Sequence, residues 1–313
     1  MKEKSVTEVA SETGAVGVIG LGAMGHGMAA SLRRTGYEVH VFDVRADVAT
    51  AFAADGGVAC TSVAAMASCC EVIISVVVNA AQTETVLFGS SDAASPAALA
   101  ATMRPGSLFV MCSTVDPNVS VEFERRLAAL GLLYLDAPIS GGAAKAASGQ
   151  MTMMTGGSDA SYAKAGGVLD AMAGKVYRLG AAGQGSKVKI INQLLAGVHI
   201  AAAAEAMALG LREGVPPDAL YEVITHSAGN SWMFENRMAH VVAGDYTALS
   251  AVDIFVKDLG LVLDTARATK FPLPLASTAH QMFMQASTAG HGREDDAAVI
   301  KIFPGITLPK AGA

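Results

Sequence analysis

The sequence predicts an α/β domain with a parallel sheet, followed by an all-helical domain. From Val16 to about Leu179, short β-branched runs alternate with Ala-rich helical stretches, which is the rhythm of repeated βα units. After Gly183 the strand-like runs stop, and helices separated by Gly- and Pro-containing turns follow. A length of 313 residues also favours two domains over one.

The predicted strands are short apolar runs, and a run without alternation suits a strand that is buried on both faces. They span residues 16–19, 39–42, 72–78, 108–112 and 132–136, and the sheet is expected to end near residues 176–179. We expect a tail over residues 1–14, a first domain over 15–182 and a second over 183–313.

The segment 186–213 is rich in alanine and apolar on nearly every face, so it predicts a long helix buried between the two domains. Ligands favour such interdomain clefts. The segment approaches the length of a membrane span, but polar residues that would be costly in lipid interrupt it: Asn192, Gln193, His199 and Glu205. A buried helix of a soluble protein is therefore the better interpretation.

Composition and charge exclude several classes of partner. Hydrophobic residues make up 52% of the chain and charged residues 16%, which predicts a closely packed interior. The net charge is -6 and the basic residues are scattered, so we expect no nucleic-acid partner. The N-terminal residues lack the apolar run of a secretory signal, and the cysteines lack metal-ligand spacing: Cys60, Cys69, Cys70 and Cys112. These features predict a cytoplasmic protein with reduced thiols and no metal site.

A glycine-rich turn follows the first predicted strand and opens a helical stretch: Gly20, Leu21, Gly22, Ala23, Met24 and Gly25. The glycines permit a tight turn, let backbone N–H groups approach a pyrophosphate, and allow close packing of helix on strand. The start of the following helix adds a partial positive charge. In this context the turn predicts a Rossmann domain that binds a dinucleotide, whereas the motif alone would describe only a tight turn.

Asp43 ends the second predicted strand, about twenty residues after the glycines. A carboxylate at this place accepts hydrogen bonds from the adenosine ribose and repels a 2′-phosphate, which favours NAD over NADP. Arg45 lies close enough in the sequence to soften that preference. The alternative is that Asp43 is an ordinary polar residue at a strand end.

Polar residues also follow two other strands, at the edge of the sheet where open α/β folds bind ligands. Val78 and Asn79 follow one strand, and Ser113 and Thr114 follow the next. We expect Val78, Asn79 and Thr114 to contact the nicotinamide half of the cofactor. The alternative is that these polar side chains cap the next helix.

Two further stretches offer groups for a small acidic substrate. Ser140, Gly141 and Gly142 can turn a hydroxyl and two unhindered N–H groups toward a carboxylate, although a simple turn is equally compatible with their composition. Lys189 and Gln193 are four residues apart on one helix, so they share a face. Burial and the nearby helix start are expected to lower the pKa of Lys189.

These motifs together resemble the β-hydroxyacid dehydrogenase family, whose members include 3-hydroxyisobutyrate dehydrogenase and tartronate semialdehyde reductase. The resemblance is carried by residues 20–29, by 136–142, and by 183–185 leading to Lys189 and Asn192, and it extends from about residue 15 to 308. It implies an NAD-dependent dehydrogenase of a small hydroxy acid, in which Ser140, Gly141 and Gly142 hold the substrate and Lys189 is the acid/base group. A homodimer or homotetramer is expected.

The resemblance also assigns residues beyond the first motifs. It implies that Lys257 faces the nicotinamide, the alternative being an ion pair with the adjacent Asp258 on the surface. Asn192 and Gln193 would hold the substrate. The family usually has two adjacent asparagines there, so Gln193 is a departure, and we expect it to orient the substrate with a longer arm.

Within the family, residues 188–209, 228–237 and 250–260 are similar to those of members that oxidise L-threonate at C2 to the 2-oxo acid. On that basis Asn230 and Ser231 would contact further hydroxyl groups of the substrate. The alternative is that they cap a helix whose Trp232 and Phe234 lie in the core. Other functions left open are reduction of a small aldehyde acid such as tartronate semialdehyde, oxidation of 3-hydroxyisobutyrate, and a non-catalytic NAD-sensing role.

Overall fold

The computed structural model describes residues 14–89 and 98–311. Contacts divide the chain into two compact units, and each is described by itself. The first comprises Met1–Ser113 and Pro117–Ser186, and the second comprises Thr114–Asp116 and Lys187–Ala313. The α/β fold of the first unit and the helical fold of the second confirm the predicted fold class.

The first unit is built on a nine-stranded sheet with the order β3-β2-β1-β4-β5-β6-β8-β7, and β9 pairs with β8. The strands are β1 Ala15–Ile19, β2 Glu38–Phe42, β3 Val58–Ala59, β4 Val72–Ser75, β5 Leu108–Met111, β6 Leu133–Asp136, β7 Ile139–Ser140, β8 Met151–Gly157 and β9 Ala173–Arg178. Strands β1 to β6 run parallel, with Val16 opposite both Val39 and Val72. The strand order reverses between β1 and β4, so the carboxyl ends of these strands flank the place where such sheets bind dinucleotides.

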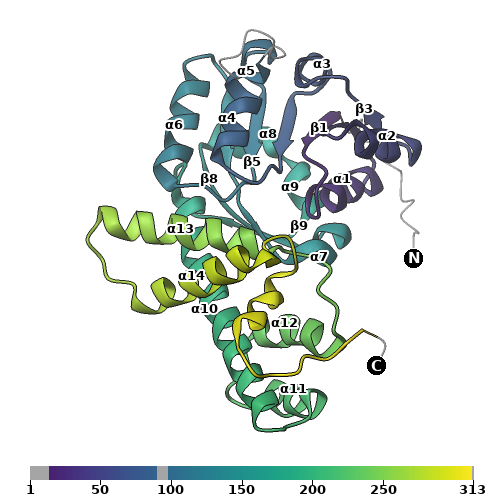
Figure 1. Cartoon of the computed structure of the whole chain (residues 1–313). Coiled ribbons are helices and arrows are strands. Elements are labelled where there is room, and N and C mark those ends of the chain that lie inside the picture. The colour runs from purple at the N-terminus through teal and green to yellow at the C-terminus, as the bar shows by residue number, and fades with distance from the viewer. Residues whose placement is uncertain (1–13, 90–97, 312–313) are drawn as a thin grey trace, which may run out of the picture. The chain divides into compact units, whose positions relative to one another are not determined.

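Nine helices accompany the sheet within the described part of the first unit. They are α1 Gly25–Arg34, α2 Ala46–Ala54, α3 Val63–Cys69, α4 Ala80–Phe88, α5 Leu99–Thr102, α6 Pro117–Ala128, α7 Gly142–Ser148, α8 Asp159–Ala165 and α9 Gly167–Met172. Helix α1 packs on α7 and α9 (Figure 1), while α6 and α8 pack on β6. The core of the unit forms where apolar faces such as Met28 and Leu32 of α1 meet Val16 and Val41 of the sheet.

The structure corrects the expected strands in several places, and β3 and β7 were not expected from the sequence. The strand expected over 72–78 ends at Ser75, because beyond one hydrogen bond from Val76 N to Ile19 O (2.8 Å) the chain turns toward α4. The sheet is also not wholly parallel, since β8 runs antiparallel to β6 and β7. Strand β8 was missed because its sequence of methionine, threonine and glycine lacks the β-branched run that marked the other strands.

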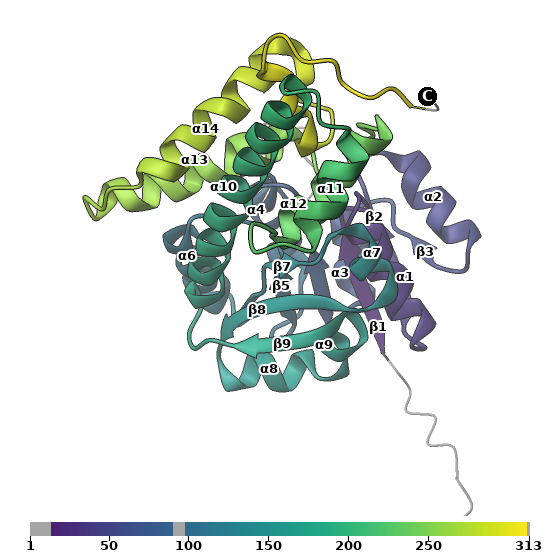
Figure 2. The ribbon, with the colours of Figure 1, turned by 90° about the horizontal axis from the view of Figure 1, so that it is seen from below.

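The second unit is a helical assembly around its own core. Its elements are α10 Gln184–Arg212, which begins in the first unit, α11 Pro217–Thr225, α12 Trp232–Ala243, α13 Val252–Ala268, α14 Pro274–Ala286, η1 Ser287–His291 and η2 Asp296–Ile302. Helices α13 and α14 lie side by side in both views (Figures 1 and 2), and the rings of Phe255 and Phe283 stack between them with centroids 5.1 Å apart. Leu259 and Met207 are fully buried in the same core.

Helix α10 has the predicted length but not the predicted complete burial. Its length and apolar composition alone would allow it to cross a membrane. Half of its most apolar stretch is buried inside the protein. Within this chain, Ile191, Leu195 and Leu209 are 60%, 50% and 62% exposed. The expectation failed because alanines supply much of the apolar character, so one side of the helix packs closely while the other keeps exposed aliphatic side chains.

The start of α10 is fixed by Asp136, the last residue of β6. The Asp136 carboxylate accepts hydrogen bonds from Gly183 N (3.0 Å), Ser186 N (2.8 Å) and Ser186 Oγ (2.7 Å). Burial raises the pKa of Asp136, although the hydrogen bonds from Ser186 and Gly183 act in the opposite direction. A buried carboxylate thus satisfies N–H groups that the first turn of a helix leaves without intrahelical partners.

Candidate active site

The glycine-rich turn has the backbone that close approach to a dinucleotide requires. Gly20 has a φ of 90°, which favours glycine, and a Cβ at Gly25 would overlap the carbonyl oxygen of Gly20. A Cβ at Gly27 would lie 2.6 Å from Ala147 N, so α1 packs on α7 only without one. A Cβ at Gly22 would meet nothing within 4 Å, which leaves open space above the turn. These residues therefore fit a bound dinucleotide.

Asp43 connects the glycine-rich turn to the end of β2. Its Oδ2 accepts a hydrogen bond from Leu21 N (2.7 Å), and its Oδ1 accepts one from Arg45 N (2.9 Å). Desolvation alone would raise the pKa of Asp43, but hydrogen bonds from Arg45 and Leu21 and the Arg45 charge lower it on balance. Asp43 is therefore an anion beside the turn. Its Oδ1 also accepts a hydrogen bond from Arg45 Nε (3.3 Å), while its Oδ2 keeps a lone pair for a ribose hydroxyl.

The residues after β4 form a helix cap. Asn79 Oδ1 accepts a hydrogen bond from Gln82 N (2.8 Å) at the start of α4, as the alternative interpretation expected. Val78 is 46% exposed, and its N–H donates to Gln82 Oε1 (2.9 Å). Contact of Val78 and Asn79 with a cofactor stays a prediction.

The segment Ser140, Gly141 and Gly142 leads from β7 into α7. Both glycines have a positive φ, 139° at Gly141 and 75° at Gly142, so the turn depends on residues without a side chain. All three residues are partly exposed. The Ser140 hydroxyl makes no hydrogen bond to another described residue and is free to donate to an anion. The turn thus offers the groups that a carboxylate needs.

Lys189 lies in a buried hydrogen-bond network formed by α10 and α13. Its Nζ donates to Gln193 Oε1 (2.7 Å), and Gln193 Nε2 donates to Asp258 Oδ2 (2.6 Å). Asn192 Nδ2 also donates to Gln193 Oε1 (3.0 Å). Lys189 and Gln193 are each 7% exposed and Asp258 is 2% exposed, whereas the neighbouring Lys187 is exposed. The network confirms that Lys189 and Gln193 share one face of the helix.

Burial lowers the pKa of Lys189 to about 8. The Asp258 carboxylate acts against this shift and the Lys257 ammonium acts with it. An amine with a pKa near neutrality exchanges a proton readily at physiological pH, which is the property of a general acid/base. From the sequence, burial and the nearby helix start were expected to lower the pKa of Lys189. Burial is the dominant cause of the shift.

Lys257 joins the same network through Asp258. Its Nζ lies 2.5 Å from Asp258 Oδ1 and donates to the backbone oxygen of Thr114 (3.3 Å). Lys257 therefore makes the adjacent ion pair that the alternative expected, but with a buried partner. The expected contact of Lys257 and Thr114 with a nicotinamide stays a prediction.

For Asp258 the sequence suggested only a surface ion pair with Lys257, although Asp258 is the most deeply buried charged group of this network. The sequence held a signal for its burial. Asp258 lies on the same face of α13 as the buried apolar residues Phe255, Leu259 and Val262. A carboxylate on such a face needs a partner, and Lys257 and Gln193 provide it.

The residues before α12 are engaged within the protein. Ser231 caps the helix, with its Oγ accepting from Phe234 N (3.0 Å), and Asn230 Nδ2 donates to Thr225 O (3.1 Å). Phe234 is buried, but Trp232 is 53% exposed, which corrects the alternative that placed both aromatics in the core. Asn230 Oδ1 is buried without a hydrogen-bond partner.

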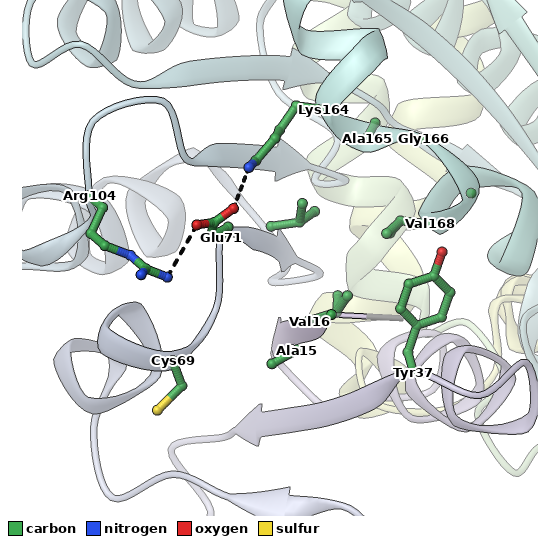
Figure 3. A pocket seen from close by; sticks show the side chains of 13 residues that line it. Ala15, Val16, Tyr37, Cys69, Glu71, Arg104, Lys164, Ala165, Gly166 and Val168 are labelled. Carbon is green, nitrogen blue, oxygen red and sulfur yellow. Dashed lines mark hydrogen bonds and ion pairs between the residues drawn. The ribbon is translucent and has the colours of Figure 1, made fainter. Parts of the chain in front are cut away.

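A separate pocket lies at the amino-terminal ends of the parallel strands (Figure 3). It is lined by residues at the starts of β1, β2 and β4, and Glu71 is held there between Lys164 and Arg104. Open α/β sheets bind ligands at the carboxyl ends of their strands, so this pocket is separate from the predicted dinucleotide site at the glycine-rich turn. Among the described residues, no group of His, Cys, Asp or Glu could hold a metal ion.

Two family models match most of the chain. The model of the NAD binding domain of 6-phosphogluconate dehydrogenase matches residues 15–180. The model of the NAD-binding region of NADP-dependent 3-hydroxyisobutyrate dehydrogenase matches residues 183–303. This chain belongs to the 3-hydroxyisobutyrate dehydrogenase-like family. The family predicted from the sequence is thereby confirmed.

The sequences of relatives in this family align with nearly the whole length of this chain. L-threonate dehydrogenase of Cupriavidus necator is 68% identical over 94% of this chain and 97% of its own length. L-threonate dehydrogenase of Escherichia coli is 54% identical over 95% of this chain and 97% of its own. A crystal structure named 3-hydroxyisobutyrate dehydrogenase from Salmonella typhimurium is 54% identical, covers 92% of this chain and 99% of its own, and has a TM-score of 0.87.

These relatives confirm the enzyme class predicted from the sequence. The chain is a dehydrogenase of the hydroxyacid type with a nicotinamide dinucleotide cofactor. Its substrate is a small hydroxy acid. The individual site residues stay predictions, because family membership does not assign them.

Proposed function

We propose that this chain oxidises L-threonate at C2 to the 2-oxo acid 2-dehydro-L-erythronate, with NAD as hydride acceptor and Lys189 as general acid/base. The observation that carries the proposal is the buried Lys189, whose pKa is lowered to about 8 and whose amino group is held by Gln193. The choice of L-threonate is supported by relatives of that name with 54% to 68% identity over almost the whole chain.

The proposed mechanism assigns each step to a named group. The substrate carboxylate binds the Ser140 hydroxyl and the backbone N–H groups of Gly141 and Gly142. Neutral Lys189 removes the proton from the C2 hydroxyl, and the resulting ammonium stabilises the oxygen of the product. Bound NAD supplies the hydride acceptor. The protein contributes orientation and charge.

Further polar groups would recognise the other hydroxyls of L-threonate. Asn230 Oδ1 is the strongest candidate because it is a buried acceptor without a protein partner. Asn192 and Ser231 keep hydrogen-bonding capacity beyond their contacts within the chain. A substrate that lacked hydroxyls would leave such groups unpaired.

On the cofactor side, we propose that the turn from Gly20 to Gly25 binds the pyrophosphate and Asp43 binds the adenosine ribose. Asp43 then favours NAD over NADP by repelling a 2′-phosphate. Val78, Asn79, Thr114 and Lys257 would contact the nicotinamide half. Assembly as a homodimer or homotetramer and a cytoplasmic location complete the proposal.

A second candidate substrate is 3-hydroxyisobutyrate, which the name of the Salmonella structure favours. Reduction of an aldehyde acid such as tartronate semialdehyde would use the same residues in the opposite direction. A non-catalytic NAD-sensing role has less support, because such a role does not need a buried lysine with a lowered pKa.

The deciding experiment compares kcat/KM for L-threonate and 3-hydroxyisobutyrate with NAD at one pH, by following NADH formation. We expect a preference for L-threonate of about a hundredfold or more, because sites built from hydrogen-bonding groups strongly reject analogues that lack the partner. Equal or better oxidation of 3-hydroxyisobutyrate would overturn the L-threonate assignment and leave the dehydrogenase class intact.

A further inference from the structure

We propose that Gln193 is a positioning residue that holds the amino group of Lys189 in place and links it to the Asp258 carboxylate, rather than an arm that binds substrate. The inference rests on Lys189 being the acid/base group of the proposed function. It replaces the substrate-orienting role that was predicted for Gln193 from the sequence.

The contacts of Gln193 leave little of its amide for a substrate. Its Oε1 accepts from Lys189 Nζ (2.7 Å) and from Asn192 Nδ2 (3.0 Å), which uses both lone pairs of that oxygen. Its Nε2 donates to Asp258 Oδ2 (2.6 Å), so one N–H remains. Gln193 is only 7% exposed, so solvent has little access to it.

The chemistry of the partners fixes which way the amide points. An ammonium only donates hydrogen bonds and a carboxylate only accepts them, so the amide oxygen must face Lys189 and the amide nitrogen must face Asp258. Gln193 therefore connects a buried cation to a buried anion through one neutral group. The spacing on α10 supports this, since residues four apart lie above one another on a helix.

The hydrogen bond from Lys189 to Gln193 also affects the protonation of Lys189. An acceptor that faces an ammonium stabilises the protonated form, so Gln193 opposes the effect of burial. The charged groups that act on Lys189 are Asp258 and Lys257, both from α13, and on its own helix Lys187 is exposed. Asp258 is shared, since its other oxygen lies 2.5 Å from Lys257 Nζ. Gln193 thus holds the position of Lys189 and favours its protonated form.

The test uses Gln193→Met, which keeps the length of the side chain and removes both hydrogen-bonding ends. Gln281→Met on the exposed surface of α14 is the matched control. The first measurement is the pH dependence of Lys189 acetylation by dilute acetic anhydride, read by peptide mass spectrometry on the full chain without substrate or cofactor. We expect the Lys189 titration of Gln193→Met to move down by about one pH unit, because a hydrogen bond to a charged group is lost.

The second measurement is the pH profile of kcat and KM for the oxidation. We expect kcat to fall about tenfold or more with KM within about threefold, because the base is misplaced while the substrate contacts remain. The acidic limb of the kcat profile should move to lower pH together with the Lys189 titration. A raised KM with an unchanged titration would show a substrate-binding arm and overturn the proposal.

Two controls keep the outcome clear. Gln193→Asn, with one methylene fewer, retains an amide and should give a smaller change in the same direction, so it replaces Gln193→Met if that variant does not fold. The acetylation experiment needs no turnover. Failure of the wild type to oxidise L-threonate would therefore reject the proposed function and leave the positioning result standing.

Discussion

At the scale of single residues, Lys189 is a buried lysine whose protonation depends on its surroundings. An isolated lysine in a protein interior is strongly disfavoured in its charged form, which is why burial lowers its pKa to about 8. The Asp258 carboxylate acts against this shift, and the Lys189 amino group donates a hydrogen bond to Gln193. The residue can therefore take up and release a proton near neutral pH, as a hydroxyacid dehydrogenase requires.

Lys189→Ala tests this role directly. We expect kcat for oxidation to fall by a factor on the order of 100 or more, the usual scale of general acid/base catalysis, with little change in NAD affinity. The measurements are steady-state kinetics and a cofactor titration. Lys187→Ala is the matched control, because this lysine lies two residues away and is exposed. Turnover of Lys189→Ala within a few-fold of wild type would refute the assignment.

At the scale of secondary structure, the contact between the end of β6 and the start of α10 fixes the helix that carries Lys189. Asp136 collects three hydrogen bonds there, from Gly183 N, Ser186 N and Ser186 Oγ. It is fully buried, so no water can replace it as an acceptor. The beginning of α10 is therefore set by a contact with the sheet rather than by a cap within the helix.

We expect Asp136→Ala to lower the free energy of unfolding by roughly 2 to 4 kcal/mol, because it leaves buried donors without a partner. Urea denaturation followed by circular dichroism measures the change. Asp136→Asn retains one acceptor oxygen and should lose less. Glu122→Ala breaks an exposed ion pair with Arg125 and should change stability by less than about 1 kcal/mol. Equal stability of Asp136→Ala and wild type would disprove the anchoring role.

At the scale of the whole molecule, cofactor binding should stabilise the folded chain by mass action. NAD at 100 times its Kd is expected to add about 2.7 kcal/mol. NADP at the same concentration should add much less, because its 2′-phosphate approaches the Asp43 carboxylate, whose pKa is lowered and which stays charged. Calorimetric melting with each cofactor measures the difference.

Asp43→Ser should bring the melting shift with NADP close to the shift with NAD, since the repelling charge is removed. Asp47→Ser, which removes an exposed carboxylate in α2, should retain the wild-type preference for NAD. The melting temperature of each variant without cofactor is measured first, because Asp43 also holds Leu21 N. If Asp43→Ser discriminates between the cofactors as wild type does, Asp43 does not bind the ribose.

Local patterns in the sequence predicted much of the fold. The glycine-rich turn, the alternation of strands and helices, and the four-residue spacing of Lys189 and Gln193 each depend on residues that are close in the chain. Such patterns report backbone geometry and helix faces directly, so the α/β unit, the helical unit and the shared face of α10 were all predictable. The resemblance that joined these motifs named the family.

Contacts between distant residues were decided only by the tertiary structure. The hydrogen bond from Gln193 to Asp258 joins residues 65 positions apart, and that from Ser186 to Asp136 joins residues 50 apart. Strand β8 likewise owes its place to pairing with β6, not to its own composition. Hydrophobic periodicity tells which face of an element is buried, but not which partner it meets there. For this reason the sequence predicted Lys189 as the base, while the tertiary structure decided which groups contact it and lower its pKa.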